Sequence, residues 1–234
     1  MKNSKQKNIK IFFMGRLLEL EKVNLHYKSH NTSVQVIKDA DLNIESGEKV
    51  AIVGKSGSGK TSLIMLIAGL ERPTSGKITF DGKVISALSE NELADIRRES
   101  IGIVFQSFYL IPNYTALENV SLILEINNVQ NARKKAADLL SQFGLADRLN
   151  HFPTQLSGGE QQRVAIARSM AVMPKLILAD EPTGNLDTEN SKLISRLLFD
   201  YAKQNNSSFI LVTHDQGFAA ECDRIIKIED GKIL

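Results

Sequence analysis

The sequence has very little cysteine and no long apolar run, and each scarcity narrows what the protein can be. Cys222 is the only cysteine, so no disulfide can form within the chain, which fits a reducing compartment. The longest apolar stretch, residues 63–70, is much shorter than the ~18 residues needed to span a bilayer. The apolar residues 11–14 are too few for the hydrophobic part of a signal peptide. A role at a membrane would therefore require docking onto another chain that sits there.

An excess of one sign of charge is also lacking. Lysine and arginine number 29 against 27 aspartate and glutamate residues, and the net charge of +2 is too small to argue for nucleic acid as a partner. Hydrophobic residues make up 42% and charged residues 24%, which is an ordinary globular composition. The 234 residues suit one large domain, or one domain with an inserted subdomain.

Residues 1–13 differ from the rest of the chain in charge, because they carry several lysines and no acidic residue. A basic arm that touches anionic lipid would have this composition. Chain termini are usually poorly ordered, so we favour a disordered extension, or an upstream stretch before a true start at Met14. The folded domain is then predicted to span residues 14–234.

A glycine-rich stretch at residues 54–61 is the strongest signal in the sequence. It fits the pattern G-x-x-x-x-G-K-[ST] at every fixed position and lies between apolar runs at residues 50–53 and 62–70. These flanks predict a buried parallel strand and a helix, which is the context that a phosphate-binding loop requires. Loop N–H groups would face the phosphates, Lys60 would contact the β- and γ-phosphates, and the Thr61 hydroxyl would bind Mg²⁺. The predicted phosphate site comprises Gly54, Lys55, Ser56, Gly57, Ser58, Gly59, Lys60 and Thr61.

Hydrophobic periodicity and turn signals predict a mixed α/β chain that is interrupted by a helical insert. The insert covers about residues 107–172, where Pro112 and Asn113 break the chain and no parallel-sheet strand is evident. Strands are predicted at residues 17–25, 34–44, 50–53, 101–105, 176–179 and 209–212, with a hairpin at 77–85. Helices are predicted at residues 62–70, 90–99, 116–127 and 132–143.

Polar side chains follow three of these strands, at the edge where ligands of open α/β sheets bind. Asp180 and Glu181 come directly after the strand at residues 176–179. Asp180 would complete the Mg²⁺ shell, and Glu181 would polarise an attacking water. Gln106 ends its own strand and would contact the metal or the water, while His214 would contact the γ-phosphate.

A second glycine-rich segment begins with Ser157, and its local signals leave two interpretations open. Ser157 and Glu160, three residues later, form a capping box, so the segment reads as a well-capped helix start. Gly158 and Gly159 weaken a first helical turn, and bare glycines make sense where a phosphate approaches the backbone closely. A second anion site and a plain helix start are therefore both compatible with the sequence.

Together these motifs resemble the ATP-binding subunit of ABC transporters, from about Leu17 to Leu234. Residues 54–61 match Walker A, residues 176–181 match Walker B with its catalytic glutamate, and residues 156–161 match the signature sequence. Tyr27 alone would fit ordinary packing as well as stacking on an adenine ring. Residues 185–187, which include Asp187, match the D-loop, and the single-residue matches are Gln106 with the Q-loop, His214 with the switch histidine and Tyr27 with the A-loop aromatic.

The resemblance implies the fold, the cofactors and the site. The implied fold is a P-loop NTPase with a mostly parallel core sheet, an N-terminal antiparallel β subdomain and an inserted α-helical subdomain. ATP and Mg²⁺ are the implied ligands, in a head-to-tail homodimer with each ATP between Walker A of one chain and Ser157, Gly158 and Gly159 of the other. The exposed glycines would meet a phosphate only in this arrangement. Implied catalytic residues are Glu181, His214, Gln106 and Lys60, and implied metal ligands are Thr61, Gln106 and Asp180.

A finer resemblance is to the branch with the lipoprotein-releasing, macrolide-export and cell-division ATPases. It rests on residues 103–108, 110–112, 116–120 and 182–187. It implies a separate transmembrane permease with a large extracytoplasmic domain, at the cytoplasmic face of the inner membrane, and no nucleic acid partner. A soluble ABC ATPase and a signalling ATPase that drives cell-wall hydrolases through a permease-like partner remain alternatives. The apolar residues 108–111 are predicted to form part of the permease dock, or else to pack beneath the insert.

Overall fold

The computed structural model describes residues 15–29 and 32–234, so the predicted extension at residues 1–13 lies outside the described residues. The strands are β1 (Arg16–Ser29), β2 (Thr32–Glu45), β3 (Lys49–Val53), β4 (Ser75–Phe80), β5 (Lys83–Val84), β6 (Ile101–Val104), β7 (Leu176–Asp180), β8 (Ser208–Val212), β9 (Arg224–Glu229) and β10 (Lys232–Ile233). The α-helices are α1 (Lys60–Ile67), α2 (Glu90–Ser100), α3 (Ala116–Ile126), α4 (Ala132–Gln142), α5 (Gly158–Met170), α6 (Thr188–Asn205) and α7 (Gln216–Ala220). The 3-10 helices are η1 (Ile85–Ala87), η2 (Ala146–Arg148) and η3 (Pro153–Gln155).

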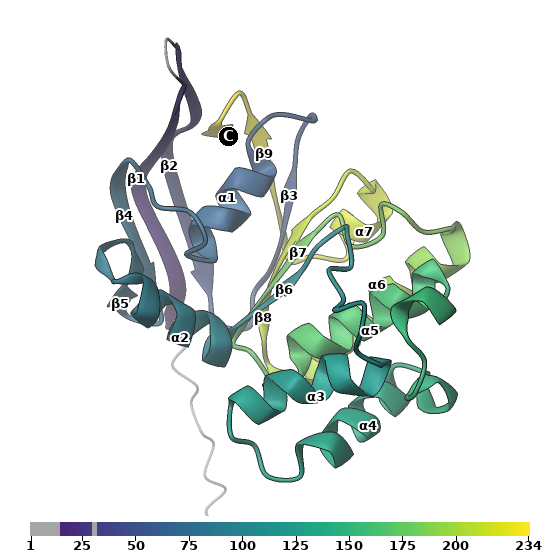
Figure 1. Cartoon of the computed structure of the whole chain (residues 1–234). Helices are drawn as coiled ribbons and strands as arrows, with labels where there is room; N and C mark the ends of the chain where they lie inside the picture. Colours follow the sequence, from purple (N-terminus) through teal and green to yellow (C-terminus); the bar gives the residue numbers. More distant parts are fainter. Residues whose placement is uncertain (1–14, 30–31) are drawn as a thin grey trace, which may run out of the picture.

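Two sheets organise the molecule, with α1 between them (Figure 1). The smaller sheet has the order β2-β1-β4-β5 and is antiparallel throughout. The larger sheet has the order β10-β9-β3-β8-β7-β6, and only the edge pair β10–β9 is antiparallel. The mostly parallel core sheet and the antiparallel N-terminal sheet that the resemblance implied are therefore confirmed.

The parallel strands divide their side chains between two cores because successive residues of a strand point to opposite faces. Leu178 of β7 and Ile210 of β8 join the core that contains α1 and the antiparallel sheet. Ile177 and Leu211, one residue away along the same strands, join the core that contains α3, α4, α5 and α6. A strand buried on both faces needs an unbroken apolar run, which explains why the sequence pattern located these strands.

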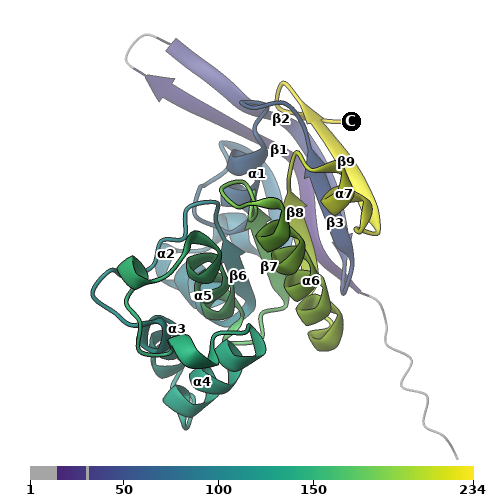
Figure 2. The same cartoon turned by 90° about the vertical axis from the view of Figure 1, so that its right-hand side faces the viewer.

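Helices α3, α4 and α5 lie together on one side of the molecule, between β6 and β7 in the chain (Figures 1 and 2). Capping boxes start two of them, with Thr115 and Glu118 at α3 and Ser157 and Glu160 at α5. Fully buried Asn119 ties the preceding loop to α3, because its side chain bonds to both the N–H and the carbonyl of Ile111. The assignment of residues 107–172 to a separate subdomain stays a prediction.

Several predicted boundaries were wrong by a few residues. Helix α1 begins at Lys60 and ends at Ile67, because Gly69 adopts a left-handed φ of +63° that a helix cannot continue. Strand β6 ends at Val104, and Ile85 begins a 3-10 helix instead of extending the hairpin strand. Helices α6 and α7 and strands β9 and β10 had not been predicted at all.

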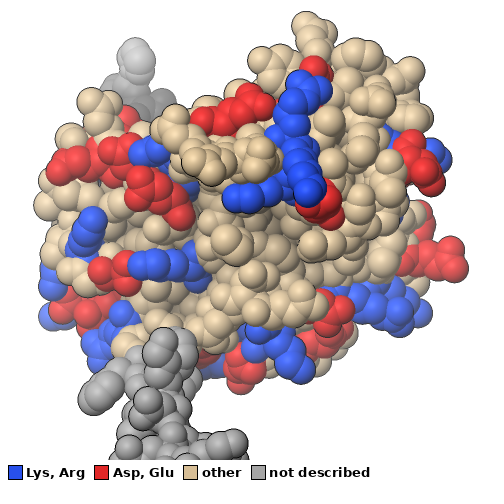
Figure 3. Space-filling model, turned by 90° about the horizontal axis from the view of Figure 1, so that it is seen from below, with Lys and Arg blue, Asp and Glu red and all other residues tan. Residues whose placement is uncertain are grey.

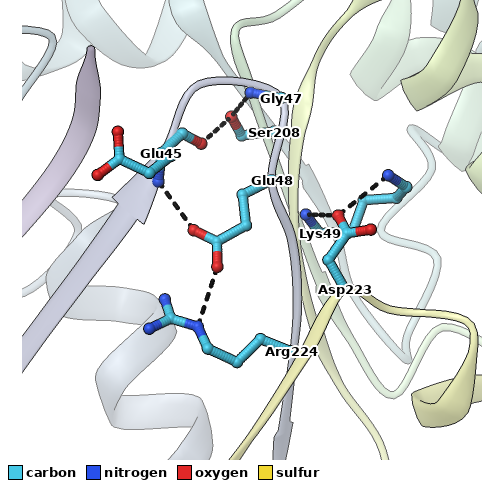
Figure 4. Close-up of polar contacts among 7 residues, drawn as sticks. All are labelled: Glu45, Gly47, Glu48, Lys49, Ser208, Asp223 and Arg224. Carbon is cyan, nitrogen blue, oxygen red and sulfur yellow. Dashed lines mark hydrogen bonds and ion pairs between the residues drawn. The ribbon is translucent and has the colours of Figure 1, made fainter. Parts of the chain in front are cut away.

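A polar cluster joins the turn between β2 and β3 to the starts of β8 and β9 (Figure 4). The carboxylate of Glu48 lies 2.9 Å from Nε of Arg224, and Asp223 accepts hydrogen bonds from both the backbone N–H and the ammonium of Lys49. The buried Ser208 hydroxyl accepts a hydrogen bond from the N–H of Gly47 and donates one to the carbonyl of Glu45. These contacts lie at the amino ends of the parallel strands, away from the polar residues at their carboxyl ends.

The surface seen from below carries both signs of charge in small interspersed groups (Figure 3). Uncharged surface lies between these groups, so this face presents no single sign of charge to a partner. Among residues 15–29 and 32–234, no helix is both long enough and apolar enough to cross a membrane.

Candidate active site

A hollow of about 510 Å³ lies where β3, β6, β7 and β8 end, at the carboxyl edge of the large sheet. It gathers residues from the ends of these four strands, although these residues are far apart in the sequence. Two lining residues, Val36 and Ser62, had not been predicted as site residues. The lining consists of Val36, Gly54, Ser56, Gly57, Gly59, Lys60, Thr61, Ser62, Gln106, Asp180, Glu181 and His214.

The glycine-rich loop curls around the ammonium group of Lys60. Its Nζ donates 2.8 Å hydrogen bonds to the carbonyls of Gly54 and Lys55. Gly54 must be glycine here, because a Cβ would lie 2.3 Å from the carbonyl oxygen of Ile228 on β9. Gly59 caps α1 at a left-handed φ of +104° without a side-chain cap, so the first N–H groups of α1 remain available to an anion.

Thr61 and Asp180 are directly linked, since the threonine hydroxyl donates a 2.8 Å hydrogen bond to Oδ2 of the carboxylate. Burial raises the pKa of Asp180, and the bond from Thr61 opposes that rise. A cation would offset the cost of keeping this carboxylate charged in a buried position. Hydroxyl, carboxylate and amide oxygens, the last from Gln106, are the donors that Mg²⁺ prefers, so these side chains fit the metal.

Glu181 is held in an uncommon backbone conformation at the edge of the hollow, with φ of +47°. Its N–H donates to the carbonyl of Val212 at 2.9 Å, and its own carbonyl accepts from the N–H of Gly184 at 3.0 Å. Its carboxylate Oε2 lies 2.8 Å from Nδ1 of the exposed His214. The two predicted polar groups of β7 and β8 therefore meet, although 18% of the Glu181 side chain is exposed against 76% for His214.

Gln106 lines the hollow and also contacts the loop after β7. Its Nε2 donates to Oδ1 of Asn185 at 3.2 Å, and Nδ2 of Asn185 returns a 3.3 Å bond to the Gln106 carbonyl. Sequence reasoning did not identify this pair. Asn185 lies in the stretch that matched the D-loop, but nothing in that stretch indicated which strand end it would meet.

Seven predicted site residues do not line the hollow. Lys55 is exposed, Ser58 is buried beneath the loop, and Tyr27 is 45% exposed on β1. The Tyr27 hydroxyl donates a 3.3 Å bond to Glu71, and burial raises its pKa. The residues outside the hollow are Tyr27, Lys55, Ser58, Ser157, Gly158, Gly159 and Asp187.

Ser157 and Gly158 are exposed at the start of α5, but the expectation that both signature glycines are exposed was wrong. Gly159 is buried, and a Cβ there would lie 2.4 Å from Oδ1 of Asn190 on α6. Asn190 is itself held by Asp187, which caps α6 by accepting from the Asn190 N–H at 2.9 Å and its side-chain amide at 2.6 Å. These bonds lower the pKa of Asp187.

The sequence of this chain is similar to those of known proteins. The family model described as "ABC transporter" matches residues 37–184. A lipoprotein-releasing system ATP-binding protein LolD of Geobacter metallireducens is 43% identical over 94% of this chain and 99% of its own length. The LolD protein of Bacteroides thetaiotaomicron is 45% identical over 86% of this chain and 93% of its own length.

Solved structures of one protein, the ATP-binding cassette MJ0796, are also similar. A dimeric post-hydrolysis state bound to ADP and Pi superposes with a TM-score of 0.87 at 40% identity, covering 93% of this chain and 96% of that one. A dimeric structure of MJ0796, described as a bacterial ABC transporter cassette, has the same TM-score and coverage at 41% identity.

Proposed function

Because the chain belongs to the ABC transporter family, as an ATP-binding and ATP-hydrolysing subunit, we propose that two copies pair head to tail around two ATP molecules. We propose further that this dimer powers a separate membrane permease. One observation carries the pairing. The hollow is lined by residues from Walker A, Walker B, the Q-loop and the switch histidine, whereas Ser157 and Gly158 lie exposed outside it. A second copy would supply the missing signature residues.

The roles of the residues follow from their positions and chemistry. The loop N–H groups and Lys60 bind the β- and γ-phosphates, in place of the carbonyls that Lys60 contacts here. Glu181 orients the attacking water and accepts its proton. His214, 2.8 Å from that carboxylate, holds it in place and contacts the γ-phosphate. Gln106, after the neighbouring strand β6, contacts the metal or the water.

Thr61, Asp180 and Gln106 would hold Mg²⁺, which neutralises charge on the phosphate oxygens when it is bound. Asp180 is buried and already bonded to Thr61, so these two oxygens need little rearrangement to share a cation. Tyr27 lies outside the hollow on β1, where the adenine ring would stack on it.

Ser157, Gly158 and Gly159 act on the ATP held by the partner copy, with Asp187 beside the shared interface. Support comes from the exposure of Ser157 and Gly158 at the start of α5, because a helix N-terminus favours an anion. ATP binding closes the dimer, and hydrolysis reopens it. The helices between β6 and β7 carry this motion to the permease.

The cargo we propose is lipoprotein, and the permease carries a large extracytoplasmic domain. Support comes from relatives such as those of Geobacter and Bacteroides, which are named for a lipoprotein-releasing system. The chain would then act at the cytoplasmic face of the inner membrane. Driving a cell-wall hydrolase through a permease-like partner is the competing outcome.

The test is to express the tagged chain in its own host, extract it with mild detergent, and identify the membrane chain that co-purifies. A permease with a large extracytoplasmic domain and a lipid-modified protein bound to it is expected. A bound cell-wall hydrolase in place of the lipid-modified protein would mean that the complex signals to hydrolases and does not release lipoprotein. If no membrane chain co-purifies while the purified chain hydrolyses ATP, the transporter assignment is overturned in favour of a soluble ATPase.

A further inference from the structure

Gln162 stands out because it is a polar side chain in the fully buried stripe of α5. Its exposed fraction is 0%, and the neighbouring buried positions of the helix are apolar or small. The stripe repeats at helical spacing through Gly159, Gln162, Ile166 and Met170. A long polar side chain in such a stripe costs stability unless it makes hydrogen bonds that the fold needs.

The side-chain amide of Gln162 bridges two loops of the hollow. Its Nε2 donates to the carbonyl of Pro182 at 2.7 Å and to the carbonyl of Phe105 at 3.3 Å. Both neighbours are acceptors, so only the NH₂ end of the amide can face them, and this fixes how the amide is oriented. The Oε1 atom on the other side is buried and finds no hydrogen-bond partner in residues 15–29 and 32–234.

These two carbonyls belong to the immediate neighbours of two site residues. Phe105 precedes Gln106, and Pro182 follows Glu181. Gln162 therefore joins the end of β6 to the end of β7 without lining the hollow itself, across separations of 57 and 20 residues. Glu181 has a left-handed backbone conformation, and a strained residue persists only where its surroundings hold it. The bond from Gln162 to the adjacent Pro182 carbonyl helps to hold Glu181 in this conformation.

The same helix carries the exposed signature residues at its start. Ser157 caps α5 and Gly158 begins it, so Gln162 lies little more than one turn farther along the same rigid element. Farther still, Arg168 donates to the carbonyls of Phe108 and Tyr109 in the loop that follows Gln106. Helix α5 thus contacts both catalytic loops of its own chain, while Ser157 and Gly158 at its start are exposed.

We propose that Gln162 is a positioning residue for ATP hydrolysis, which sets the Gln106 and Glu181 loops relative to each other and to the start of α5. The proposal rests on the proposed function. It means that the contact of Ser157 with ATP in one site is mechanically linked to the hydrolytic residues of the other. The unpaired Oε1 fits a side chain retained for geometry, since an apolar residue of similar length would avoid that cost.

The test compares Gln162→Met with wild type in the full chain. Methionine has similar length and flexibility but no donor, so it leaves the Phe105 and Pro182 carbonyls unheld. Single-turnover hydrolysis of Mg²⁺–ATP is expected to slow by about 10- to 100-fold, the loss typical of misplaced catalytic groups. The dissociation constant of a fluorescent ATP analogue should stay within about threefold, because the Lys60 loop does not contact Gln162.

Tyr201→Phe is the matched control, because it too removes a buried hydrogen bond to a backbone carbonyl, in this case that of Met170 at the end of α5, at 2.6 Å. It should lower stability without slowing hydrolysis. Hydrogen exchange in peptides covering residues 105–109 and 183–187 should accelerate in Gln162→Met and not in Tyr201→Phe. Gln162→Asn, whose amide is one methylene shorter, should reproduce the slow hydrolysis if the methionine variant does not fold.

Two results would overturn the positioning role. One is unchanged hydrolysis by a folded Gln162→Met chain, and the other is an equal slowing in Tyr201→Phe, which would make the effect a general consequence of instability. Neither result affects the proposed function, which fails separately if the wild-type chain does not hydrolyse ATP.

Discussion

Glu181 combines an uncommon backbone conformation with a carboxylate 2.8 Å from the His214 ring. Its N–H donates to Val212 at the end of β8 and its carbonyl accepts from Gly184 in the same loop, so the backbone of Glu181 is held at the edge of the hollow. A carboxylate held in this way suits a general base, because its position relative to an attacking water is set before substrate binds. The neighbouring Asp180 is tied to Thr61 instead, which separates the two acids into different roles.

Glu181→Gln should bind ATP and barely hydrolyse it. The amide keeps the shape of the side chain and removes the basic oxygen, and general-base catalysis is worth about 10²- to 10⁴-fold, or about 3–5 kcal/mol of barrier. The variant should accumulate as an ATP-bound dimer in size-exclusion chromatography. Turnover close to wild type would mean that another group activates the water.

The two signature glycines should respond differently to alanine. A Cβ at Gly158 meets nothing closer than 3.8 Å, whereas one at Gly159 would lie 2.4 Å from Oδ1 of Asn190. Gly159→Ala should therefore lower the free energy of unfolding by roughly 1–3 kcal/mol, measured in urea, and adding Asn190→Ala should recover most of that loss. Gly158→Ala should leave stability unchanged and weaken only the ATP-driven dimer. Equal destabilisation by both single variants would contradict this division.

The loop after β6 shows how one short element divides between core and surface. Of the apolar residues 108–111, predicted either to form part of the permease dock or to pack beneath the insert, Leu110 packs against the core of the helical insert and only Tyr109 is strongly exposed, at 67%. Tyr109 has a φ of +46°, its ring lies edge-on to Phe105 at 5.3 Å, and its carbonyl accepts from Arg168 at 2.6 Å. We therefore predict that Tyr109, an exposed aromatic on a well-held loop, contacts the permease.

Tyr109→Asp should abolish or strongly reduce co-purification of the permease and leave basal ATP hydrolysis near wild type. A charge on an apolar docking residue must be desolvated when the partner binds, while this side chain does not line the hollow. Met173→Asp is the matched control, since Met173 is 69% exposed and has a φ of +51°. Loss of both folding and basal activity in Tyr109→Asp would instead place the side chain in the core.

At the scale of the whole molecule, each chain contains one phosphate hollow and one exposed helix start that lies outside it. Lys60 lines the hollow, and Ser157 is at the start of α5. If the two features serve the same chain, a lesion in either disables that chain's own site. If they serve different chains of a dimer, mixing two variant chains places both lesions in one site and leaves the other site intact.

Mixing Lys60→Ala chains with Ser157→Arg chains should restore single-turnover hydrolysis. Each homodimer carries a lesion in both sites and should be inactive. In a mixed dimer with shared sites, both lesions fall in one site and the other is intact, so up to one ATP per mixed dimer should be hydrolysed. Single turnover is the appropriate measurement because coupling between sites can suppress steady-state cycling.

Cis sites would leave one lesion in every site of the mixed dimer. If mixed dimers form, as shown by two affinity tags, and no ATP is hydrolysed, the shared-site arrangement is wrong. Recovery in the mixture, with neither variant active alone, has no explanation within a single chain.

Local pattern in the sequence was sufficient for the elements that hold the phosphates and the acids. The glycine spacing of residues 54–61 between apolar runs located β3, the loop and α1, because such a loop is built from consecutive residues. The apolar strand before Asp180 and Glu181 located β7 in the same way. The rule that ligands meet parallel strands at their carboxyl ends then brought Gln106 and His214 to the same edge, as the structure does.

Only the tertiary structure decided which side chains hold those residues in place. Gly159 is buried because α6 brings Asn190 against it, and Gln162 matters because packing puts the ends of β6 and β7 on either side of its amide. Neither contact leaves a periodic or local trace, since each depends on how helices pack against the sheet. Sequence spacing reports the geometry of one strand, turn or helix, and the contacts between them are set by the shape of the packed core.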